Sequence, residues 1–188
     1  MKKTMTLATV LLGALVSSSV FAAPTAPTTT TGNVGTIRFV GSITETTCDF
    51  IGSQGGSQSN VINLGTNSVA VVNGATGSPV VDFSLIGTKA NGSACEIADG
   101  KSVDVSWVPA SGAWKANGLE NVGTATNTVV KLMDKNNKPF NALYQTVNYV
   151  AADATNGKLP FKANIMNTGT AATAGTIVSA AKFAVAYK

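Results

Sequence analysis

The chain closes with residues 175–188, GTIVSAAKFAVAYK, in which apolar side chains recur at every second position. This period is typical of a half-buried β-strand. One face of the strand carries Ile177, Ala181, Phe183, Val185 and Tyr187, and the other carries Lys182, Ala184 and Ala186. Because no neighbouring strand follows, we expect the apolar face to pair elsewhere in its own sheet or to leave room for a strand from outside. The second arrangement is favoured, because the other end of the chain offers a suitable strand.

Residues 1–22 have the parts of a secretory signal peptide. Lys2 and Lys3 form a basic start, residues 7–16 are apolar, and small residues lead to Ala22. The apolar stretch is shorter than the roughly 20 residues that span a bilayer, and no later segment is long enough either. We therefore expect export and cleavage before Ala23. Removing 22 of the 188 residues leaves 166, which suits one domain with a core.

Charge and residue content argue against several functional classes. Without Lys2 and Lys3, eleven basic side chains face nine acidic ones and are scattered, so nucleic-acid binding has little electrostatic support. The chain has no histidine, and its serines lie mostly in turn-like segments. No nucleophile and base arrangement and no metal-ligand set can be recognised. We expect neither an enzyme nor a metal or cofactor site.

Two cysteines, Cys48 and Cys95, remain in the exported chain. An even number of cysteines in an oxidising compartment favours a disulfide. A CxxC redox motif or a metal cluster would need closer cysteines or histidines. We therefore predict one structural disulfide between these residues.

Short segments rich in Val, Ile, Thr and Phe alternate with clusters of Gly, Asn and Ser. We predict strands at residues 60–64, 79–86, 101–108, 127–134, 146–150, 158–166 and 176–187, with loops at 52–59, around 117 and at 151–157. No long amphipathic helix is evident. This all-β pattern, in a chain of this length, favours an antiparallel β-sandwich of immunoglobulin type over a parallel α/β sheet.

The two tryptophans receive different predictions. Trp107 continues an alternating run with Val103 and Val105, so we expect it in the core. Trp114 lies in a loop-like stretch, where it could be exposed as a sugar-binding platform. Packing across the end of the sandwich is the favoured role for this residue.

The segment before Cys48 changes character along its length. Residues 23–31 are rich in Pro and Thr, which favours a flexible or extended segment. From residue 35 the period becomes two, with one face formed by Ile37, Phe39, Gly41 and Ile43. Glycine weakens a strand, so Gly41 indicates a place where the backbone approaches another surface closely.

These features together resemble the subunits of chaperone-usher pili, the type 1 fimbrial proteins of Gram-negative bacteria. The resemblance covers essentially the whole mature chain. It rests on residues 35–43 (GTIRFVGSI) upstream of Cys48, on Cys95, on residues 129–134 (VVKLMD) and 160–163 (PFKA), on Thr168 and Gly169, on Gly175 fourteenth from the end, and on the closing AKFAVAYK.

The resemblance implies an incomplete immunoglobulin-like sandwich that lacks its last strand and exposes a hydrophobic groove. In this family a periplasmic chaperone first lends a strand to the groove. The outer-membrane usher then exchanges that strand for the N-terminal extension of the next subunit, which completes the fold in trans. The implied organisation is a signal peptide at residues 1–22, a donor-strand extension at 23–44 and a pilin domain at 45–188.

The family pattern also assigns roles to individual residues. The inserting face of the donor strand would be Ile37, Phe39, Gly41 and Ile43, with Gly41 at a shallow pocket. The C-terminal motif that borders the groove and meets the chaperone would be Gly175, Phe183, Val185, Tyr187 and the carboxylate of Lys188. Departures from the pattern are the long Thr- and Pro-rich extension and the terminal lysine. The expected product is a cell-surface fimbria for adhesion, chiefly a homopolymer of neighbouring subunits; a minor tip or adapter subunit is the alternative.

Overall fold

The structure of the protein is a computed structural model and describes residues 48–188. The signal peptide predicted at residues 1–22 and the extension predicted at 23–44 lie outside this range. The proposed donor-strand residues Ile37, Phe39, Gly41 and Ile43 therefore do as well. From Cys48 onward, no helix has the length and apolar character needed to cross a membrane.

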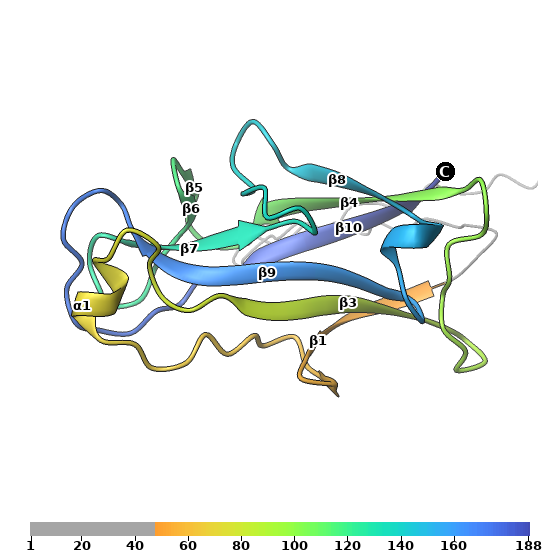
Figure 1. Cartoon of the computed structure of the whole chain (residues 1–188), viewed down its shortest axis with the longest axis horizontal. Coiled ribbons are helices and arrows are strands. Elements are labelled where there is room, and N and C mark those ends of the chain that lie inside the picture. Colours follow the sequence, from red (N-terminus) through yellow and green to blue (C-terminus); the bar gives the residue numbers. More distant parts are fainter. Residues whose placement is uncertain (1–47) are drawn as a thin grey trace, which may run out of the picture. The chain divides into compact units, whose positions relative to one another are not determined.

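The described chain folds into two antiparallel sheets (Figure 1). The larger sheet has the spatial order β2 (Ser57–Gln58), β1 (Cys48–Gln54), β3 (Val81–Lys89), β9 (Lys158–Asn167), β7 (Thr128–Met133), β6 (Gly118–Glu120) and β5 (Trp114–Lys115). The smaller sheet has the order β10 (Ala181–Tyr187), β4 (Ser102–Pro109) and β8 (Thr146–Val150). Helical structure within residues 48–188 is limited to single turns, α1 (Val69–Val72) and the 3-10 turn η1 (Ala151–Asp153). The predicted all-β antiparallel sandwich is confirmed.

The core lies between the two sheets and is rich in aromatic side chains. Phe161 of β9 is fully buried, and its ring lies 5.3 Å from that of Trp107 and 5.6 Å from that of Tyr149, between centroids. Edge-to-face contacts of this kind favour one packing arrangement beyond the area they bury. Trp107 is only 6% exposed, so its predicted core position is confirmed. Trp114 lies in β5 and packs half-buried against the same core.

Five of the predicted strands correspond closely to observed ones. Residues 79–86, 101–108, 127–134, 146–150 and 158–166 match β3, β4, β7, β8 and β9. The stretch predicted as a loop at 52–59 instead contains the end of β1, a turn and β2. Gly55 and Gly56 have φ values of 58° and 86° in that turn, a conformation that glycine adopts without steric cost. The glycine content therefore marks a tight hairpin rather than an open loop.

The predicted disulfide between Cys48 and Cys95 is present, with the two α-carbons 6.1 Å apart. It joins the first residue of β1 to the segment that follows β3, and Cys95 is buried. Gly87 of β3 packs under this link, because a β-carbon on it would lie 2.9 Å from the Cys95 β-carbon. The disulfide thus fixes the start of β1 beside the end of β3, with which it pairs.

Candidate functional site

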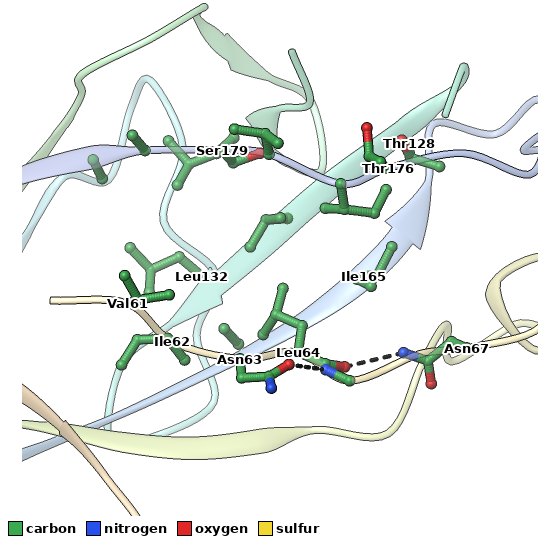
Figure 2. Close-up of a pocket in the computed structure, with 18 of the residues that line it drawn as sticks. Val61, Ile62, Asn63, Leu64, Asn67, Thr128, Leu132, Ile165, Thr176 and Ser179 are labelled. Carbon is green, nitrogen blue, oxygen red and sulfur yellow. Dashed lines mark hydrogen bonds between the residues drawn. The ribbon is translucent and has the colours of Figure 1, made fainter. Parts of the chain in front are cut away.

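A groove with a volume of about 1170 Å³ opens along one side of the sandwich. One wall is the chain after β2, residues 59–67, and the other runs along residues 173–183. The floor is formed by inward-facing apolar side chains of both sheets, including Leu85, Trp107, Leu132 and Ile165. Figure 2 shows Leu132 and Ile165 between the two walls, with Ile62 and Leu64 on one side and Thr176 and Ser179 on the other.

Strand β10 supplies an open edge beside this groove, because β4 is its only sheet neighbour within residues 48–188. Lys188 and Ser102 exchange both backbone hydrogen bonds, with N–H···O distances of 2.8 and 3.2 Å. At the other end, the Ala110 N–H donates to the Ala180 carbonyl at 2.8 Å. Hydrogen-bonded residues alternate in an antiparallel ladder, so the even-numbered residues of β10 are turned toward β4. The odd-numbered residues present their N–H and C=O groups to the opposite edge.

The same odd-numbered residues carry the apolar face of β10. Ala181, Phe183 and Val185 pack half-buried against the core, and the Phe183 ring lies 5.5 Å from that of Trp107. Tyr187 is 38% exposed and lies 6.4 Å from Phe50 between ring centroids. The predicted alternation of this strand is therefore confirmed. Its apolar residues are less buried than those of β4, since nothing within the described chain covers the free edge.

In the opposite wall, buried and exposed side chains alternate as in a strand, but the backbone forms no ladder with a neighbouring strand. Ile62 and Leu64 pack against the core, whereas Val61 is 75% exposed. The Asn63 N–H donates to Gln54 Oε1, and Gln54 Nε2 donates to the Asn63 carbonyl, both at 2.8 Å. The prediction of a strand at residues 60–64 is wrong, because this backbone is held by a side-chain amide and not by a neighbouring strand.

The C-terminal motif residues lie along one continuous stretch. Gly175 and Phe183 line the groove, and Val185, Tyr187 and Lys188 continue in the same direction beyond it. The Lys188 ammonium pairs with Asp104, whose pKa is lowered by hydrogen bonds from Asn148 and then from Lys188. The prediction of a strand over 176–187 holds only from Ala181, since residues 176–178 bond to the chain at 121–125.

The arrangement offers what an incoming β-strand needs. Its floor is apolar, and its edge supplies backbone donors and acceptors that have no partner within residues 48–188. No group of three metal-ligating side chains occurs in the part of the chain from Cys48 to Lys188. Ile62 and Leu64 line the groove, although the sequence pattern at residues 60–64 indicates only an ordinary strand.

Comparisons with known proteins agree with this picture, although no protein-family model matches the chain. The chain is 30% identical over 159 residues to the F107 fimbrial protein of Escherichia coli, which covers 82% of this chain and 86% of that protein. The crystal structure of the P pilus rod subunit PapA matches the fold with a TM-score of 0.52 at 20% identity, over 81% of this chain and 100% of that one. The first is named a fimbrial protein, which agrees with the expectation of a structural subunit and not an enzyme.

Proposed function

This chain belongs to the fimbrial protein family, and on that premise we propose that it polymerises by donor-strand exchange. It is a structural subunit of a pilus, which is a surface appendage. In the proposed mechanism the groove of one subunit takes up the N-terminal extension of the next. The observation that carries the proposal is the apolar groove of about 1170 Å³ beside the free edge of β10.

The occupant we propose is residues 35–43 of a second copy of the chain. Ile37, Phe39 and Ile43 share one face of this stretch and the other face is mostly polar, which matches a groove that receives every second side chain. Burying each of them would contribute about 1.5 to 3 kcal/mol before the entropy of ordering the strand is subtracted. Gly41 would sit where the floor leaves least room for a side chain.

Such a contact joins different surfaces of two copies, so it does not close on itself and produces a filament. An unfilled groove with an open strand edge is also an aggregation hazard. We therefore propose that a periplasmic chaperone occupies the groove after export and that an outer-membrane usher catalyses the exchange. The signal-peptide pattern of residues 1–22 supports this route.

Deletion of residues 23–43 tests the proposal. The truncated chain should still form a complex with the chaperone, because its groove is intact, but it should not form fibres in a purified exchange reaction or on cells. Deletion of residues 23–31, which removes only the Pro- and Thr-rich part, is the matched control and should allow fibres. Fibres built from the 23–43 deletion would contradict the proposal.

We propose the principal shaft subunit over a minor tip or adapter subunit. The extension at residues 35–43 and the groove would give each copy both a donor and an acceptor, which suits a repeating unit. Immunogold electron microscopy of cells that make the protein distinguishes the two. Labelling along the shaft is expected, and labelling confined to fibre ends would favour the minor subunit.

A further inference from the structure

The open edge of β10 continues backward along the chain, beyond the first residue of the strand. The Val178 N–H donates to Asn121 Oδ1 at 2.7 Å, and the Val178 carbonyl accepts from the Val122 N–H at 2.8 Å. Both backbone groups of this even-numbered residue are therefore turned toward the segment 121–125. Val178 thus continues the alternation of β10, in which the even-numbered residues are the ones bonded within the described chain.

Thr176 repeats the arrangement two residues earlier. Its N–H donates to Thr124 Oγ1 at 2.8 Å, and its carbonyl accepts from the Ala125 N–H at 3.1 Å. The Asn121 side-chain amide reaches the same carbonyl at 3.3 Å. Segment 121–125 thus takes the place of a strand beside residues 176–178.

The backbone groups of the odd-numbered residues Ile177 and Ser179 remain available on the side of the groove. No hydrogen bond within residues 48–188 uses the backbone N–H or C=O of Ile177 or Ser179. The Ile177 side chain packs against the core, and the Ser179 hydroxyl donates to the Glu120 carbonyl at 2.8 Å. Residues 177–187 consequently share one uninterrupted free edge, which is longer than β10 itself.

Asn121 determines the shape of the segment that makes this extension. Its Nδ2 donates to the Ala125 carbonyl at 2.7 Å and to Thr128 Oγ1 at 2.9 Å. Its Oδ1 accepts from the Gly123 N–H at 2.9 Å as well as from Val178. One half-buried side chain therefore both folds the turn and holds the groove wall against it.

We propose that Asn121 is a positioning residue that extends the strand-receiving edge from Ala181 back to Ile177. An incoming strand then pairs along residues 177–187 and not along β10 alone. This inference rests on the proposed function, because it concerns how much of the same groove a donor strand uses.

The test uses the complex of the full mature chain with its chaperone and labelled peptides of residues 33–46, 37–46 and 33–42 of this chain. After each peptide has displaced the chaperone, its rate of loss is measured in a chase. The truncated peptide that does not reach Ile177 and Ser179 should leave about tenfold faster than the full peptide, because it cannot form backbone hydrogen bonds with these residues. The full peptide should leave the Asn121→Ala subunit at least threefold faster than it leaves the unmodified subunit. The same truncated peptide should leave both subunits at the same rate.

A general loss of stability would accelerate the loss of all the peptides, so the dependence on peptide length separates positioning from folding. Asn148→Ala is the matched control, because that amide bonds to Asp104 away from the groove. Hydrogen exchange on the unmodified subunit gives a second measurement: the amides of Ile177 and Ser179 should become protected with the full peptide only.

Equal rates for all peptides, or exposed amides at both positions with the full peptide bound, would overturn the inference. The same holds if Asn121→Ala leaves the difference between peptides unchanged. The proposed function falls as well only if no peptide enters the groove of the unmodified subunit.

Discussion

Gly175 and Ala125 lie backbone against backbone, so that a β-carbon at position 175 would overlap the Ala125 nitrogen and α-carbon. Gly123 lies equally close to Thr176, because a β-carbon at position 123 would overlap the Thr176 carbonyl. Only glycine permits so close an approach at both positions. This crossing explains physically why a glycine stands at the start of the C-terminal motif: it lets the groove wall dock on segment 121–125.

Replacing Gly175 with valine should push the groove wall away from this segment. We expect the free energy of unfolding to fall by about 1 to 3 kcal/mol, as for other overpacked sites, and the yield of chaperone complex to fall with it. Denaturant unfolding of the purified complex measures the first effect. Ala171→Val, at an exposed position nearby, should leave both quantities unchanged; equal behaviour of the two variants would contradict the assigned contact.

Removing the disulfide should destabilise the domain strongly. The link joins residues separated by 47 positions, and in the chain-entropy model its loss in a Cys48→Ser/Cys95→Ser variant costs about 4 kcal/mol. The midpoint of denaturant unfolding, with and without reducing agent, checks this. Reductant should lower the midpoint of the native chain and leave that of the double variant unchanged.

Gly41→Leu should slow or block strand exchange, because the donor strand would then carry a large side chain into a shallow pocket. Exchange between chaperone-bound subunits, followed by native gel electrophoresis, gives the rate. Val40→Leu enlarges the opposite face of the same strand and serves as the control. An unchanged exchange rate for Gly41→Leu would refute the pocket assignment.

The mature chain expressed in a periplasm without its chaperone should aggregate or be degraded, since nothing among residues 48–188 covers its groove and strand edge. Immunoblots of soluble and insoluble fractions measure the outcome. Coexpression of the chaperone should restore soluble protein. A stable, soluble monomer in its absence would count heavily against an open groove.

Alkaline pH should weaken the fold at Tyr144. Burial, and then the hydrogen bond that its hydroxyl donates to Asp134 at 2.7 Å, raise its pKa to about 12. Because this lies above the unfolded value of 10, the contribution is complete below pH 10 and is lost as the pH rises toward 12. The difference in unfolding free energy between the native chain and Tyr144→Phe should therefore narrow from pH 8 to pH 11. A constant difference would contradict the assignment.

Much of the fold can be read from the sequence, because most strands show a clear period of two. Strand β1 could not be predicted in this way, because its buried residues Gly52 and Ser53 are small and do not form an alternating apolar pattern. Residues 60–64 and 176–180 were predicted as strands on sound patterns. Residues 60–64 have the side-chain order of a strand but no backbone partner within the described chain, whereas residues 176–178 bond to segment 121–125 without forming a regular ladder.

The site was predictable in part. Gly175 and Phe183 belong to a recognisable C-terminal pattern, and both line the groove. The opposite wall at Ile62 and Leu64, and the contribution of Asn121, depend on contacts between distant segments. Asn121 and Val178 are 57 residues apart, and a single asparagine in a turn-like stretch gives no sign of such a contact.

The position of Trp107 has a practical consequence. Its ring belongs to the groove floor while Trp114 does not, so the two indoles differ in their sensitivity to whatever fills the space. Uptake of a strand would place new side chains beside the Trp107 ring and so change its fluorescence. Trp107 can therefore serve as an intrinsic fluorescence probe, with which assembly can be followed in solution without any dye.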